Sequence, residues 1–119
     1  ALYLDDQGRP NFTYKAFEAS QVTLAASRPL ADGMHTVAVA FDYDGGGYGK
    51  GALVRLMVDG QVQGEGRLTA TPPALWSALS ESLDVGVDSG STAVVNPPED
   101  RIGYPFAGGE IREVKFDLR

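Results

Sequence analysis

The sequence predicts an all-β protein in which short antiparallel strands form a sandwich or a barrel. Three observations indicate this class: short runs alternate apolar with small or polar residues, turn residues recur roughly every ten positions, and no stretch alternates strands with long helical patterns. The length of 119 residues is typical of one domain, and no shift of composition indicates a second core. We therefore expect a single β-sandwich domain over residues 1–119.

The clearest predicted strand covers residues 36–44. One of its faces carries the larger apolar side chains Val37, Val39, Phe41 and Tyr43, with small or acidic residues opposite. This pattern is typical of a half-buried antiparallel strand. Weaker versions of the same alternation predict strands around residues 2–4, 12–17, 22–26 and 114–118.

A tight hairpin is the strongest local feature. Asp59 and Gly60 separate two strand-like runs, residues 53–58 and 61–68, and glycine tolerates the positive φ that a two-residue turn requires. Only residues 74–80 have a composition that suits a helix, and they suffice for about one turn.

Composition excludes several classes of partner. The chain has 16 acidic and 10 basic residues, a formal charge of −6, and its basic residues are scattered, so we expect no nucleic-acid partner. No apolar run approaches the roughly 20 residues of a membrane span, so we expect no membrane insertion. Cysteine is absent, which excludes disulfides and thiolate chemistry and leaves the compartment open. Because an apolar-alternating segment follows Ala1 directly, we expect an excised fragment of a longer protein.

Catalytic patterns fit poorly. The glycine-dense residues 45–51 lack the spacing of a phosphate-binding loop, and the simpler interpretation is a long hairpin connection with positive φ. Asp42 and Asp44 share a strand face and could serve as paired acids, or they are solvated acids at a strand end. The single histidine, His35, follows a turn without a serine nucleophile pattern, so a structural role is favoured.

A metal site is a sharper hypothesis. Asp84 and Asp88 lie in a run that continues into a turn containing glycine. Carboxylate oxygens are among the ligands that calcium prefers. The EF-hand spacing is absent. Two interpretations remain open: a structural calcium bound by Asp84 or Asp88, and a strand that ends in an Asx-type turn.

Several segments together resemble the C-terminal region of bacterial arylsulfatases of the sulfatase family, in the same order along the chain. The resembling segments are residues 32–37, 41–51, 58–60, 64–67, 71–72, 81–91 and 104–108, followed by a closing Ile-x-x-Val strand. The resemblance spans about residues 2 to 118, and its most distinctive segment is the glycine-dense loop.

This resemblance implies a concanavalin A-like jelly-roll sandwich that is appended to a sulfatase catalytic domain in cis. In that family the catalytic domain uses calcium and a formylglycine made from Cys or Ser in a Cys/Ser-x-Pro-Ser/Ala-Arg motif. The nearest match here, residues 27–31, lacks the fifth-position arginine, so no catalytic residue is carried over and we expect no cofactor in this fragment. A bacterial location, periplasmic or cytoplasmic, would follow.

Two functions of different classes therefore remain. The first is a non-catalytic accessory domain, which after excision could form a homodimer through an exposed edge. The second is a carbohydrate-binding module that stacks sugars on the exposed aromatics Tyr48, Trp76 and Tyr104. Net acidity disfavours a sulfated glycan, although Arg55 and Arg67 could meet across the hairpin. An independent glycosidase ranks last, because its paired acids are missing.

Overall fold

The computed structural model describes residues 1–16, 20–73, 83–88 and 104–118, and every regular element in these ranges is a β-strand. All strand pairs in these ranges are antiparallel. The all-β, antiparallel class is thus confirmed for the described residues. They include no helix that is long and apolar enough to cross a membrane. The chain divides into two compact units, Ala1–Ser77 and Ala78–Arg119.

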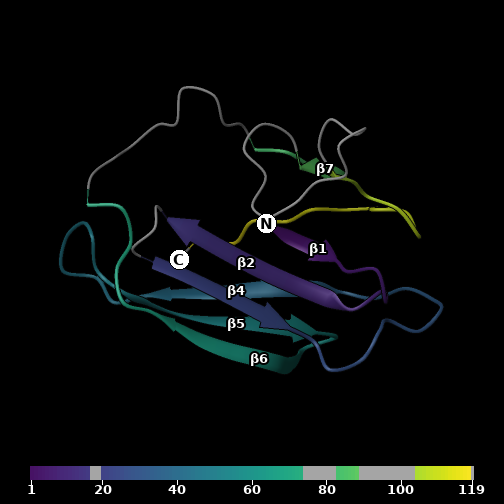
Figure 1. Ribbon diagram of the computed structural model, residues 1–119, viewed down its shortest axis with the longest axis horizontal. Coiled ribbons are helices and arrows are strands. Elements are labelled where there is room, and N and C mark those ends of the chain that lie inside the picture. Colours follow the sequence, from purple (N-terminus) through teal and green to yellow (C-terminus); the bar gives the residue numbers. More distant parts are fainter. Residues whose placement is uncertain (17–19, 74–82, 89–103, 119) are drawn as a thin grey trace. The chain divides into compact units, whose positions relative to one another are not determined.

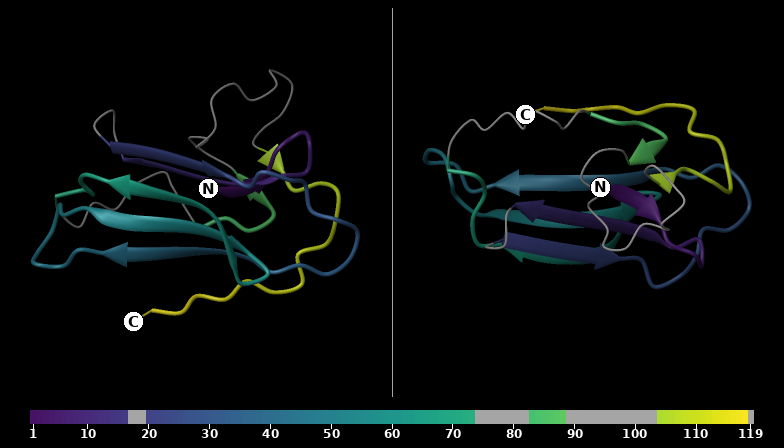
Figure 2. Two further views of the ribbon diagram at one scale, coloured as in Figure 1. Left: turned by 90° about the horizontal axis from the view of Figure 1, so that it is seen from below. Right: turned by 45° about the horizontal axis from the view of Figure 1, so that its top comes forward.

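The first unit contains two three-stranded sheets, which Figure 2 shows as two layers. The first sheet has the order β1-β2-β3, formed by Leu2–Leu4, Pro10–Ala16 and Ser20–Ala25 (Figure 1). The second has the order β4-β5-β6, formed by Val37–Tyr43, Ala52–Val58 and Gln61–Leu68. Sequential strands are neighbours in both sheets, so each sheet is a simple meander.

The core of this unit lies between the two sheets. β3 packs over β5 and β6, and β2 packs over β5. The buried cluster consists of Leu24, Ala26, Ala52, Val54, Leu56 and Leu68. β5 is the central strand of its sheet, and alternate side chains of this strand reach 0% exposure at Ala52, Val54 and Leu56. The period of two in the sequence therefore becomes one buried face and one outer face.

A β-bulge in β6 decides which of its side chains face the core. Met57 pairs with Val62, but the next pair joins Leu56 to Gly64, so Gln63 is the extra residue. Without the bulge, every residue after it would turn to the opposite face, because side chains alternate along a strand. The bulge places Leu68 inside, at 1% exposure.

Two glycines of β6 give the opposite sheet room to approach. Gly64 and Gly66 lie on the inner face, across from Leu56 and Val54 of β5. A Cβ atom on Gly66 would lie 2.5 Å from Cγ2 of Val22, which β3 directs at this strand. A bare backbone at Gly66 is therefore part of the contact between the sheets.

The predictions for the first unit agree with these strands. The strand predicted at residues 36–44 is β4, and the predicted hairpin is β5 and β6 joined at Asp59 and Gly60. Both turn residues have positive φ, 49° and 78°, as a type I′ turn requires. Phe17, at the end of the predicted strand 12–17, and the predicted helical turn at 74–80 lie outside the described residues.

The second unit has one described strand pair, β7 at Val87–Asp88 and β8 at Tyr104–Pro105. The Phe106 amide donates to the Gly86 carbonyl at 2.7 Å and extends this ladder. The strand predicted at residues 114–118 is wrong, since residues 106–118 form no strand. Alternating apolar residues can give a strand one apolar face and one polar face. A strand also needs hydrogen bonds to the backbone of a neighbouring strand, and the alternation does not show whether such a neighbour exists.

Candidate functional site

Charged side chains cross the outer face of the second sheet. Arg55 of β5 donates from Nη1 to Asp42 of β4 at 2.6 Å and from Nε to Glu65 of β6 at 3.0 Å. The hydrogen bond to Glu65 is the main cause of the raised pKa of Arg55. One guanidinium therefore links all three strands and faces a carboxylate on each side.

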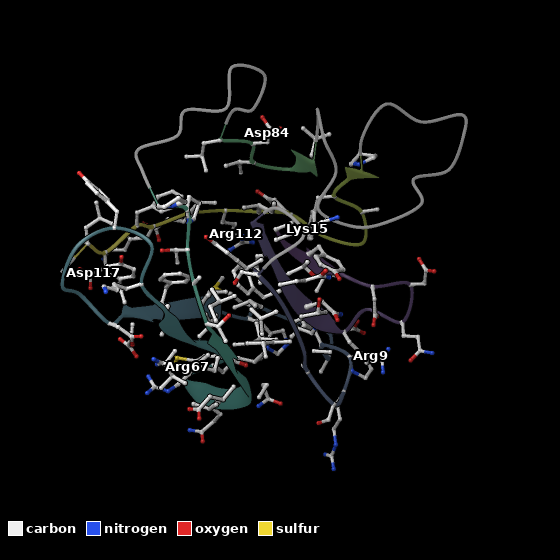
Figure 3. All side chains as sticks on the ribbon, turned by 60° about the vertical axis from the view of Figure 1, so that its left-hand side comes forward. Arg9, Lys15, Arg67, Asp84, Arg112 and Asp117 are labelled. Carbon is white, nitrogen blue, oxygen red and sulfur yellow. The ribbon has the colours of Figure 1, made fainter. Side chains whose placement is uncertain are left out.

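Arg67, labelled in Figure 3, forms a separate pair with Asp44, the residue that follows β4. Arg55 lies opposite Glu65 in the register, and Arg67 lies opposite Leu53. The two arginines thus share a face but bind different carboxylates. A sulfate would have to displace those carboxylates, so this face is a poor anion site. The candidate acids Asp42 and Asp44 are likewise each bound to an arginine.

The loop between β4 and β5 is braced at its base. The Tyr43 hydroxyl donates to the Gly47 carbonyl and accepts the Lys50 amide, and the Asp44 amide donates to the Gly51 carbonyl. Glycines 45, 46, 47 and 49 have positive φ, as expected for this connection. The loop presents Tyr48 with 66% of its surface exposed. This arrangement suits an aromatic platform held by a fixed backbone.

Gly51 closes that loop without space for a side chain. A Cβ atom there would lie 2.5 Å from the Leu68 carbonyl oxygen and 2.8 Å from Oδ2 of Asp44. Thr71 adds a bond from its hydroxyl to the Lys50 carbonyl at 2.9 Å. The loop base is therefore fixed to the segment that follows β6.

His35 lies in the connection between the two sheets, and each of its ring nitrogens contacts an oxygen atom. Its Nδ1 lies 2.7 Å from Oδ2 of Asp59, and its Nε2 lies 3.0 Å from the Ala31 carbonyl. These contacts, with Asp59 first, raise the pKa of His35. The pKa of Asp59 is lowered, mainly by the backbone N–H of Thr36 and then by His35. The sequence indicated a structural role for His35 but did not identify Asp59 as its partner.

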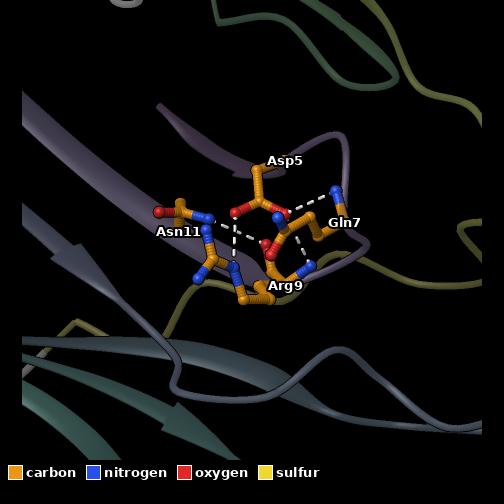
Figure 4. A network of polar contacts seen from close by, with 4 residues as sticks. All are labelled: Asp5, Gln7, Arg9 and Asn11. Atoms are coloured by element: carbon orange, nitrogen blue, oxygen red, sulfur yellow. Dashed lines mark hydrogen bonds and ion pairs between the residues drawn. The ribbon is translucent and has the colours of Figure 1, made fainter.

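The turn between β1 and β2 contains a second polar network (Figure 4). Oδ1 of Asp5 accepts the amides of Gln7 and Arg9 at 2.9 and 3.0 Å, and Oδ2 accepts Nε of Arg9 at 2.8 Å. The backbone N–H of Arg9 is the main cause that lowers the pKa of Asp5 to about 2. Asn11 donates to the Arg9 carbonyl at 2.8 Å. All of these bonds fix the turn, so the network has a structural role.

The predicted calcium ligands lie in the second unit. Asp84 precedes β7, and Asp88 is a residue of β7 that pairs with Tyr104 of β8. Among the described residues, no group of three or more His, Asp or Glu side chains could hold a metal ion. The calcium hypothesis therefore stays a prediction for Asp84 and Asp88.

The three predicted sugar-binding aromatics have different placements. Tyr48 is exposed on its braced loop in the first unit. Tyr104 belongs to β8 in the second unit, and Trp76 lies outside the described residues. Tyr48 is thus the one of the three whose side chain is described, and that side chain is exposed.

The chain matches no protein-family model, no curated protein and no solved structure.

Proposed function

We propose that the chain is a non-catalytic accessory domain with a concanavalin A-like jelly-roll fold, and that it packs against the catalytic domain of an arylsulfatase-like hydrolase. The ordered resemblance to bacterial arylsulfatases supports this proposal. Its most distinctive segments coincide with features of one sheet: residues 41–51 contain the end of β4 and the braced loop, and residues 58–60 contain the β5–β6 turn. These are consecutive features of one meander.

The observation that carries the proposal is the incomplete burial of β4. This strand is at the edge of its sheet among the described strands. Phe41 and Tyr43 of β4 are 40% and 42% exposed, whereas their cross-strand neighbours Val54 and Ala52 on the same face are 0% exposed. Large apolar side chains at an open edge are typical of a surface that another domain covers.

The pairing of charges in the first unit fits a scaffold. The carboxylates of Asp42, Asp44 and Glu65 are bound to arginines, and that of Asp5 is bound to turn amides and Arg9. Each of these carboxylates is therefore already bound to a partner within the first unit. In this proposal the parent's catalytic domain supplies the sulfatase chemistry.

A comparison of the longer gene product with this chain alone tests the proposal. We expect the longer protein to hydrolyse an aryl sulfate and the isolated chain not to do so. In the longer protein, Phe41→Glu should lower the thermal midpoint and activity by disturbing the β4 contact, whereas Val62→Glu, on the outer face, should not. Turnover of an aryl sulfate by the isolated chain would overturn the proposal.

The open edge also predicts how the isolated chain behaves. Without its covering domain, β4 could pair with a second copy of itself, since unpaired strand edges are templates for association. We expect light scattering to show a dimer whose population grows with protein concentration, and Phe41→Glu to reduce it. A chain that stays strictly monomeric at high concentration would contradict dimerisation through the β4 edge.

A carbohydrate-binding module is the second candidate, and the exposure of Tyr48 favours it. Aromatic side chains stack on sugar faces, and the braced loop would limit the entropy lost on binding. A glycan array with the isolated chain tests this function. Binding that Tyr48→Ala abolishes and Tyr48→Phe retains would favour the module over the accessory domain.

A further inference from the structure

We propose that His35 and Asp59 form a pH-sensitive clasp that holds the connection between the two sheets of the first unit to the β5–β6 turn. Residues 26–36 connect β3 of one sheet to β4 of the other. The ring of His35 holds this connection to the β5–β6 turn through Asp59, and holds the connection to itself through the Ala31 carbonyl. The clasp consists of the His35 ring, the Asp59 carboxylate and the Ala31 carbonyl. It does not depend on the function proposed above.

Both contacts of the His35 ring can be hydrogen bonds only when the ring carries its second proton. Both ring nitrogens face oxygens that can only accept: a carboxylate at 2.7 Å and a carbonyl at 3.0 Å. A neutral imidazole has one N–H, so one of its nitrogens would face an oxygen lone pair. The imidazolium has two N–H groups and satisfies both acceptors. Loss of one proton therefore removes one of the two contacts and replaces it with repulsion.

The neighbouring bonds limit how far the clasp opens. The Thr36 amide donates to Oδ1 of Asp59 at 2.9 Å, and the Asp59 amide donates to the Thr36 carbonyl at 2.8 Å. Neither bond uses the ring, so both remain when His35 is neutral. The start of β4 thus stays attached to the turn, while the neutral His35 ring keeps only one of its two contacts. Within the described residues, Asp59 is the charged group that faces the ring, and the connection itself contributes the neutral Ala31 carbonyl.

The two pKa shifts give the pH window of the clasp. The pKa of His35 is raised from 6.5, so its contribution to stability is complete below 6.5 and is lost as the pH rises through the folded value. The pKa of Asp59 is lowered from 3.8, so its contribution is complete above 3.8 and is lost as the pH falls through the folded value. The clasp is closed between these limits and opens as the pH rises through the folded-state pKa of His35.

Proton NMR of the ring measures this directly, because the sequence contains one histidine. We expect the folded chain to titrate with a midpoint above 6.5 and to carry both ring protons below it. Asp59→Asn should move the midpoint down toward 6.5. Asparagine tolerates positive φ and keeps an oxygen for the Thr36 amide, so the turn is preserved. Asp32→Asn, which removes a carboxylate three positions before His35, is the matched control and should leave the midpoint unchanged.

Thermal unfolding provides a second readout if Asp59→Asn fails to fold. Across roughly pH 5 to 9, where histidine is the side chain that titrates, the wild type should lose more thermal stability than His35→Gln. Equal pH profiles for the two proteins would overturn the clasp. A folded-state midpoint at or below 6.5 would overturn it as well.

Discussion

The inner and outer faces of the β4-β5-β6 sheet share one backbone but are held by different forces. On the inner face of β5, Ala52, Val54 and Leu56 are 0% exposed and belong to one buried cluster with Leu24 of the other sheet. On the outer face, Asp42, Arg55 and Glu65 keep 60%, 33% and 54% of their side-chain surface exposed. Burial of apolar area stabilises far more than exposed ion pairs, which typically contribute less than about 1 kcal/mol each. We conclude that the inner face provides most of the stability of this sheet, and the exposed ion pairs of the outer face add little.

Truncation of Leu56 should show the largest difference between the two faces. Leu56 is 0% exposed at the centre of the core, so Leu56→Ala should lower the free energy of unfolding by about 2–5 kcal/mol. Leu53→Ala removes the same atoms from the half-buried outer face of the same strand and should cost clearly less. Chemical denaturation of both variants measures this, and equal losses would contradict the assignment of the two faces.

Addition of a methyl group to β6 should have an intermediate effect. Gly66→Ala places Cβ 2.5 Å from Cγ2 of Val22 and should cost about 1–3 kcal/mol through overpacking. Gly64→Ala is the matched control, because its Cβ would lie 3.5 Å from the nearest atom, Cβ of Leu24. It should be neutral or slightly stabilising. Val22→Ala in the Gly66→Ala background should recover part of the loss in a thermal melt, and no recovery would place the clash elsewhere.

Neutralisation of the outer face should have the smallest effect. Asp42→Asn and Glu65→Gln each leave Arg55 one carboxylate partner, so the thermal midpoint should change little. Any difference from the wild type should shrink as salt is added, because salt screens exposed charges. A salt-independent loss as large as that of Gly66→Ala would show that this face contributes more than exposure indicates.

The parts of the fold that local patterns determine could be predicted from the sequence. Alternation identified β4, and the Asp59-Gly60 pair identified the hairpin, because positive φ and the period of two are properties of neighbouring residues. The same reasoning failed at residues 114–118. Their apolar side chains alternate as those of β4 do, but a ladder partner is a property of the whole chain.

The parts that depend on register could not be predicted. The sequence left open whether Arg55 and Arg67 meet across the hairpin, and the bulge at Gln63 sets Arg55 opposite Glu65. His35 and Asp59 are 24 residues apart, and they meet because the connection after β3 returns to the β5–β6 turn. Of the predicted site residues, Tyr48 is placed in an exposed position, and the predictions for Trp76, Tyr104, Asp84 and Asp88 remain open.

The bulge also fixes where β6 can change in length. Deletion of Gln63 alone would join Val62 to Gly64 in an unbroken ladder, and Leu68 would still point inward. Deletion of Glu65 could keep Leu68 inside only by turning the polar Gln63 toward Leu56. A natural or engineered variant of this hairpin can therefore lose one residue at Gln63 and keep its interior, whereas a loss a few positions later would carry an amide into the core.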